Sequence, residues 1–341
     1  MNKNTLVSIL ITCLVFANFF IYSRVITNSI PDAVYPDYVP ENEQEISSSE
    51  QDDASDVEGV PYGYIYTTAD IKDTYSGDLI LVNITHPYVF ENTPSAVRTP
   101  SIESVYAKKS SSYSVSNMNV TMDTVAIEAF NKMMDDFYAY NSNKKTIIVT
   151  QGTRTYEEQQ QMLNLKIEQF GENQTIAQQP GFSEHHSGLA MDISTYVGGV
   201  MGTFTGENEY SWVFENAHKY GIILRYPQEK EDITGISYES WHFRYVGVPH
   251  AQYMYQNSLT LEEYIDILAM YPFESIQLQI ATDQANYSVY SVPVVSDGTK
   301  VPVPTIDKGE FVLSGDNSGH IIVTVKNASA DIQEPSLDIQ E

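Results

Sequence analysis

Cysteine is almost absent from this sequence, and basic residues are scarce. The 341 residues include one cysteine, Cys13, which excludes a disulfide framework and any zinc site built from cysteines. Lys and Arg number 18 against 45 Asp and Glu, which gives a net charge of -27. Because such a surface repels phosphate backbones, we expect no nucleic-acid partner. Hydrophobic residues make up 42% of the chain, which is enough to build a folded core.

Charged residues are missing from residues 6–23, which are almost wholly apolar. At about 1.5 Å per residue, this run can just cross a hydrocarbon core about 30 Å thick. No small-residue cleavage site follows it, which favours a membrane anchor over a cleaved signal peptide. Lys3 lies before the run, and Arg24 followed by acidic sequence lies after it. Positive charge stays in the cytoplasm, so we expect a single-pass anchor over 1–24, with the rest of the chain extracellular and facing the cell wall. A buried soluble helix is the alternative.

The composition changes along the chain and predicts four further regions. Residues 25–60 are acidic and rich in Ser and Pro, which is typical of an extended, disordered linker. Residues 61–272 have a globular composition and form the main domain with an N-terminal extension. Apolar and polar residues alternate over 273–327, which predicts a small all-β appendage. Residues 328–341 form an acidic tail.

Helices and strands are mixed in the main domain. Apolar residues at a spacing of three and four predict a helix over 121–138. A capping box from Thr155 to Glu158 predicts a helix that ends near Phe170. Further helices are expected over 211–220 and from Thr260, and strands over 77–83, 145–150, 222–226 and 241–246.

Two short segments concentrate side chains that can bind a metal ion. Residues 183–192 are SEHHSGLAMD, and residues 239–245 are ESWHFRY. In the first segment, a turn at Gly188 would allow His185 and Asp192 to reach the same point. Together with a second histidine, they would form a set of two imidazoles and one carboxylate. Such a set is common in catalytic zinc sites and leaves a fourth position for water.

The second segment contributes His242 and Glu239, which are three residues apart. Zinc lowers the pKa of a bound water toward about 7, and a carboxylate that is not a ligand can then carry the proton of that water. Glu239 is the candidate for this role. The alternative for each histidine is a structural, hydrogen-bonded side chain. The concentration of two histidines and two acids in two short segments argues against that alternative.

The order of residues resembles the zinc D-alanyl-D-alanine carboxypeptidases of the VanY type. The shared pattern is S-x-H-x-x-G-x-A-x-D over 183–192, followed by E-x-W-H-F-R-Y over 239–245, within a motif core over 120–250. The resemblance implies an α+β fold of the Hedgehog/DD-peptidase type, with a small antiparallel sheet, flanking helices and a zinc cleft. It also implies the roles of four side chains. His185, Asp192 and His242 would be zinc ligands, and Glu239 the general base.

A third segment, QGTRTYEEQ over 151–159, is similar to the S-G-Y-R-S-x-x-x-Q segment of these enzymes, with Thr153 in place of the aromatic residue. A guanidinium recognises a terminal carboxylate with paired hydrogen bonds, which makes Arg154 a candidate for substrate binding. The resemblance implies that Gln159 and Ser183 also contact the substrate. The alternatives are a surface role for Arg154 and a turn role for Ser183.

These observations predict a membrane-anchored zinc D,D-carboxypeptidase that removes the C-terminal D-Ala from peptidoglycan stem peptides. An L,D-carboxypeptidase and a peptidoglycan endopeptidase would use the same zinc chemistry and remain alternatives. A non-catalytic wall-binding module is a third alternative, and the β appendage gives it some support.

Overall fold

The computed structural model describes residues 61–328. The predicted anchor, acidic linker and acidic tail lie outside these residues, except for Ala328, and stay predictions. Within the described part of the chain, every helix is too short or too polar to cross a bilayer.

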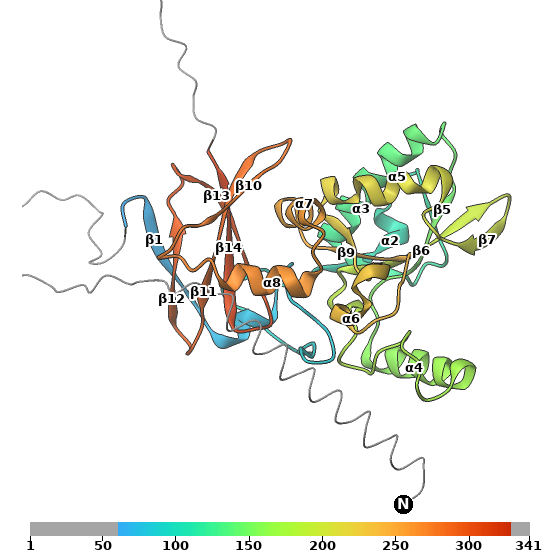
Figure 1. Cartoon of the computed structure of the whole chain (residues 1–341), viewed down its shortest axis with the longest axis horizontal. Helices are drawn as coiled ribbons and strands as arrows, with labels where there is room; N and C mark the ends of the chain where they lie inside the picture. Colours follow the sequence, from blue (N-terminus) through green and yellow to red (C-terminus); the bar gives the residue numbers. More distant parts are fainter. Residues whose placement is uncertain (1–60, 329–341) are drawn as a thin grey trace, which may run out of the picture. The chain divides into compact units, whose positions relative to one another are not determined.

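The main domain is built on a six-stranded sheet with the order β3-β5-β6-β9-β8, in which β7 pairs with β6 (Figure 1). The strands are β3 (Ser114–Val115), β5 (Ile147–Gln151), β6 (Ala190–Val197), β7 (Val200–Thr203), β8 (Ile222–Leu224) and β9 (His242–Tyr245). All pairs are antiparallel except β3 with β5. Helix α3 (Thr124–Tyr140) packs its buried Phe130 and Met133 into one core with Val149, Ile193 and Phe243 of the sheet. The predicted α+β fold class is confirmed.

The predicted helices form, with small shifts at their ends. Helix α4 (Tyr156–Phe170) begins at the predicted capping box, in which Thr155 and Glu158 each bond the other's backbone N–H. Helices α5 (Ser211–Asn216) and η4 (Ala217–Tyr220) follow each other in the 211–220 segment. The helix predicted over 121–138 starts later, because Thr121–Asp123 forms strand β4 and pairs with β2 (Ile102–Ser104). Short elements occur elsewhere: η1 (Ile71–Tyr75), α2 (Val105–Lys108), η3 (Asn208–Tyr210), η5 (Gln228–Lys230) and α6 (Glu231–Thr234).

The strand predicted over 77–83 is wrong, since the described segment forms none. Its apolar residues 79–82 are buried, as a strand's would be. The carbonyl groups of Asp78 and Ile80 instead accept hydrogen bonds from Nη2 of Arg244, at 3.0 and 2.9 Å. The N–H groups of Leu79 and Leu81 donate to Ser314 and Asp316. A buried guanidinium and residues 314–316 therefore take the place of a neighbouring strand as the hydrogen-bond partners of this segment.

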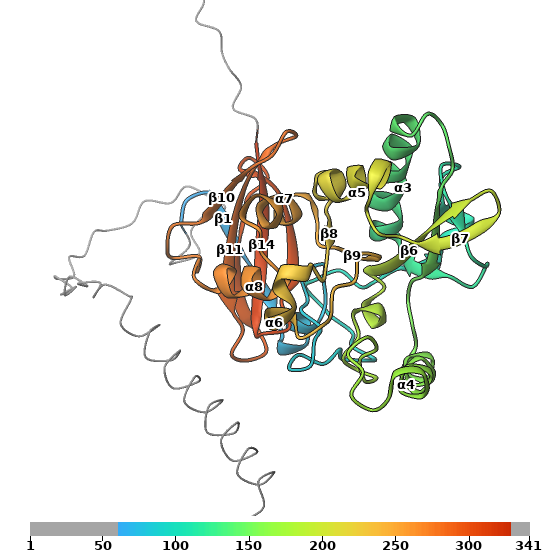
Figure 2. The same cartoon turned by 45° about the vertical axis from the view of Figure 1, so that its right-hand side comes forward.

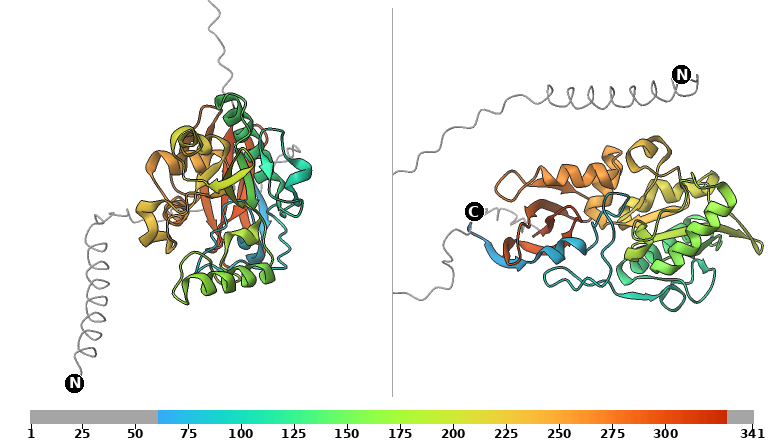
Figure 3. Two further views of the ribbon diagram at one scale, coloured as in Figure 1. Left: turned by 90° about the vertical axis from the view of Figure 1, so that its right-hand side faces the viewer. Right: turned by 90° about the horizontal axis from the view of Figure 1, so that it is seen from below.

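The C-terminal part forms a second β structure, as predicted, but it includes a strand from the start of the described chain. Its four-stranded antiparallel sheet has the order β10-β11-β14-β13, and β12 pairs separately with β1. Figure 3 shows β1 in blue beside the red C-terminal strands. The strands are β1 (Tyr64–Ala69), β10 (Leu278–Ala281), β11 (Asn286–Pro293), β12 (Thr299–Pro304), β13 (Gly309–Gly315) and β14 (His320–Asn327).

Helices α7 (Val248–Asn257) and α8 (Leu261–Ala269) lie between the two β structures (Figures 1 and 2). Their buried side chains share one apolar core with Ile223 in β8 of the first sheet and with Val289 and Ile322 of the second sheet. The two β structures are therefore joined by a common core and not by a flexible connection.

Candidate active site

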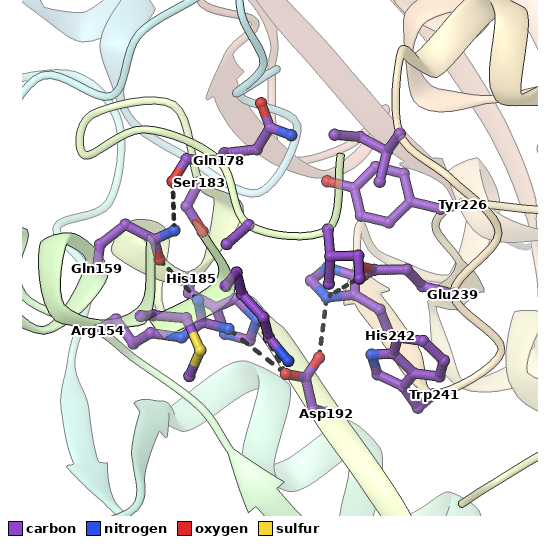
Figure 4. A pocket seen from close by; sticks show the side chains of 15 residues that line it. Arg154, Gln159, Gln178, Ser183, His185, Asp192, Tyr226, Glu239, Trp241 and His242 are labelled. Carbon is purple, nitrogen blue, oxygen red and sulfur yellow. Dashed lines mark hydrogen bonds and ion pairs between the residues drawn. The ribbon is translucent and has the colours of Figure 1, made fainter. Parts of the chain in front are cut away.

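The structure brings together the three predicted metal ligands, His185, Asp192 and His242 (Figure 4). One donor atom from each residue lies within 4.8 Å of the donor atoms of the other two. The imidazole rings meet edge to face, with centroids 4.9 Å apart. Residues from two separate segments of the sequence thus converge on one point.

Strand register and one glycine produce this convergence. Asp192 in β6 lies directly opposite His242 in β9. His185 lies in η2 (Glu184–Ser187), which ends at Gly188 with a φ of 74°. A side chain at Gly188 would be strained at that φ and would displace the end of Ile102, so the turn favours glycine.

The donor atoms fit a zinc ion. Nδ1 of His185 donates to the carbonyl of Gly152 at 2.6 Å, which leaves the lone pair on Nε2. That Nε2 is buried, has no hydrogen-bond partner within residues 61–328, and lies 3.4 Å from Oδ2 of Asp192. Nδ1 of His242 lies 2.9 Å from Oδ1 of the same carboxylate. Buried polar atoms are normally paired, and two imidazoles with one carboxylate are a catalytic zinc set.

The charges around the three donors shift the pKa of each of them. Burial, followed by the charge of Arg154, lowers the pKa of His185 to about 4, so its imidazole is neutral at pH 7. Burial by itself raises the pKa of Asp192, but the two histidines outweigh it and hold this pKa well below its ordinary value. Burial lowers the pKa of His242, but Asp192 and Glu184 raise it to about 9. The carboxylates around His242 therefore favour a positive charge at the three donors.

Glu239 lies at the turn that leads into β9, where the N–H of His242 donates to its carbonyl at 3.2 Å. Its Oε2 is 3.7 Å from Nδ1 of His242, so the carboxyl group borders the three donors. Burial raises the pKa of Glu239 to about 7. A carboxyl group with this pKa can both accept and return a proton near neutral pH.

Arg154 approaches the same point from the start of α4. Its Nη1 donates to Oε1 of Gln159 at 2.7 Å, and its Nη2 lies 3.4 Å from Oδ2 of Asp192. The other end of the Gln159 amide donates to the carbonyl of Gln178 at 2.7 Å. Gln159 thus holds Arg154 in place, while its substrate contact stays a prediction.

A pocket of about 190 Å³ contains all seven predicted site residues, including Ser183 (Figure 4). Tyr226 and Trp241 also line it and were missed as site residues. The ring of Tyr226 lies 4.9 Å from that of His242, and Figure 4 shows its hydroxyl group directed into the pocket. The rest of the lining comes from α4, from the loop that follows it and from the segment after α6: Met162, Lys166, Ile176, Ala177, Gln178 and Ile236.

His186, which directly follows His185, has a structural role. Its Nδ1 donates to the carbonyl of Arg154 at 2.8 Å, and its Nε2 accepts from the N–H of Gly181 at 3.0 Å. Both ring nitrogens are therefore engaged away from the three donors, and the ring supports the backbone at Arg154.

Two imidazoles and a carboxylate around one point, with a protonatable glutamate and an arginine beside them in a small pocket, define a metal-dependent hydrolase. Known proteins identify the class further. The VanY family profile, described as D-alanyl-D-alanine carboxypeptidase, matches residues 119–248. The D-alanyl-D-alanine carboxypeptidase of Enterococcus faecium is 32% identical over 254 residues, which cover 74% of this chain and 77% of that protein. The chain belongs to the VanY family of D-alanyl-D-alanine carboxypeptidases.

Two further relatives agree with this assignment. The bifunctional D-Ala-D-Ala dipeptidase and D-Ala-D-Ala carboxypeptidase VanXYC of Enterococcus gallinarum is 39% identical over 132 residues, 37% of this chain and 70% of that protein. The vancomycin resistance D,D-dipeptidase VanXYg, solved with a D-Ala-D-Ala phosphinate analog, aligns with a TM-score of 0.66 at 27% identity. The alignment covers 77% of this chain and 99% of that one. The predicted enzyme class, a zinc D,D-carboxypeptidase, is confirmed.

Proposed function

We propose that the pocket hydrolyses the last peptide bond of peptidoglycan stem peptides and releases the terminal D-Ala. The observation that carries this proposal is the position of Arg154, whose guanidinium lies on the pocket wall beside the metal donors. A guanidinium pairs with a free carboxylate. A substrate places its terminal carboxylate beside the metal donors only when the bond to be cut is its last peptide bond.

The chemistry follows from the residues around the donors. A zinc ion held by His185, Asp192 and His242 would polarise the scissile carbonyl and acidify a water molecule. Glu239 removes the proton of the attacking water and returns it to the departing amine, for which its pKa of about 7 is suited. Arg154 binds the terminal carboxylate and so fixes the peptide bond within reach of Glu239.

We also propose that the enzyme acts outside the cell, tethered to the membrane. The support is the charge-free apolar run over 6–23 and the acidic residues that follow it. An anchor of this kind would keep the pocket next to its polymeric substrate.

The proposed reaction is tested by incubating the protein with muropeptides and analysing the products by mass spectrometry, with added zinc and with excess chelator. We expect pentapeptides to lose one alanine with zinc, and to stay intact with chelator. Loss of alanine from tetrapeptides alone would indicate an L,D-carboxypeptidase, and cleaved cross-links would indicate an endopeptidase. Unchanged muropeptides would leave only the wall-binding module.

Replacing Arg154 by alanine should lower kcat/KM for a pentapeptide by about 100-fold or more, since a buried charged partner is lost. The matched control is the same peptide with a C-terminal amide. Wild-type enzyme should cut the amide poorly, and Arg154→Ala should cut it no worse than wild type does. Equal losses on both peptides would show that Arg154 acts on the fold and not on the carboxylate.

A further inference from the structure

Glu184 is a buried carboxylate immediately before His185, and the mechanism above does not use it. Its side chain is 0% exposed. Its Oε1 accepts from Nε of Arg225 at 2.9 Å and from Nη1 of Arg244 at 2.8 Å. Glu184 is therefore an ionised carboxylate inside the protein.

The second oxygen of Glu184 faces the back of a predicted metal ligand. Oε2 lies 3.7 Å from Nε2 of His242. Both atoms are buried, and neither has a hydrogen-bond partner among the residues that the structure describes. The two atoms would have to move closer by less than about 1 Å to form an ordinary hydrogen bond. Nδ1, on the other side of the ring, points to Asp192 and the metal donors.

We infer that Glu184 is a positioning residue, which accepts the Nε2 proton of His242 and thereby directs the Nδ1 lone pair to the metal. This inference rests on the proposed metal site. An imidazole that donates one N–H to a carboxylate is fixed in tautomer and orientation, and its free nitrogen becomes a better ligand.

The two arginines keep Glu184 in this position. The terminal nitrogens of Arg225 donate to Glu262 at the start of α8, at 2.8 and 2.6 Å. Arg244 also donates to the carbonyls of residues 78 and 80. Since both guanidinium groups are fixed by other partners, the carboxylate can neither turn into the pocket nor reach solvent.

Glu184→Gln tests the inference because the amide is asymmetric. The amide oxygen should turn to the arginines, so that its NH2 group faces Nε2 of His242 and favours a proton on Nδ1. We expect zinc affinity, measured by chelator competition at fixed pH, to fall by about 10- to 100-fold. The matched control is Glu263→Gln, whose carboxylate bonds Lys230 and the N–H of Thr260 and neither arginine, and which should leave zinc affinity within about twofold of wild type.

A second measurement uses the zinc-loaded wild-type protein and does not depend on a variant that folds. Nitrogen-15 NMR of the imidazoles should show the proton of His242 on Nε2. A proton on Nδ1, an unchanged zinc affinity in Glu184→Gln, or an equal loss in Glu263→Gln would each overturn the inference. If the wild-type protein binds no zinc, the proposed metal site itself fails, which is a separate result.

Discussion

Glu239→Gln should lower kcat for D-Ala release by about a thousandfold, because general acid–base catalysis contributes about 10² to 10⁴. The glutamine has the same shape but cannot take a proton from water or return it to the amine. Zinc content should stay at the wild-type level, since Glu239 borders the three donors without being needed as one of them.

The test measures steady-state D-Ala release and bound zinc in the same preparation. Glu229→Gln is the matched control, since Glu229 is exposed and lies outside the catalytic pocket. We expect the control to match wild type in both measurements. A Glu239→Gln enzyme within tenfold of wild type would exclude Glu239 as the base, and a loss of zinc would make it a ligand.

His185→Ala has the second large effect, the loss of both bound zinc and D-Ala release. Its Nε2 lies in the buried centre of the donor set, so alanine would leave two ligands out of three. Two protein ligands do not make a catalytic zinc site. We expect activity below detection and a metal content near zero after dialysis.

His86→Ala is the control for this experiment, because the His86 ring bonds Asn83 and Thr85 and lies outside the pocket. It should keep both zinc and activity. Full D-Ala release by His185→Ala, or by wild-type enzyme in excess chelator, would overturn the metal assignment.

The site was predictable from the sequence because its residues lie in local patterns. The turn at Gly188 needs glycine, and the capping box at Thr155 places Arg154 just before a helix. What the sequence did not reveal depends on tertiary contacts. The segment over 77–83 has the pattern of a buried strand, but its carbonyl groups bind Arg244, and no local pattern encodes that partner.

Two residues near the metal donors were missed for related reasons. Glu184 directly precedes the predicted ligand His185. Its role depends on Arg225 and Arg244, which are distant in the sequence and bind it only in the folded chain. Tyr226 was assigned to a strand end, and only the fold shows that its ring faces His242. The sequence held one signal for Glu184. Arg225 and Arg244 lie in predicted strands of a chain with few basic residues, and a buried arginine requires an acidic partner.

The pairing of β1 with β12 affects how the chain acquires its structure. Tyr64 is made early, but its partner Pro304 follows only after the entire metal-binding region has been synthesised. Contacts between residues so distant in sequence form slowly, while β5, β6 and β9 can assemble first. Until residue 304 has emerged, β1 remains an unpaired edge that can associate with other chains.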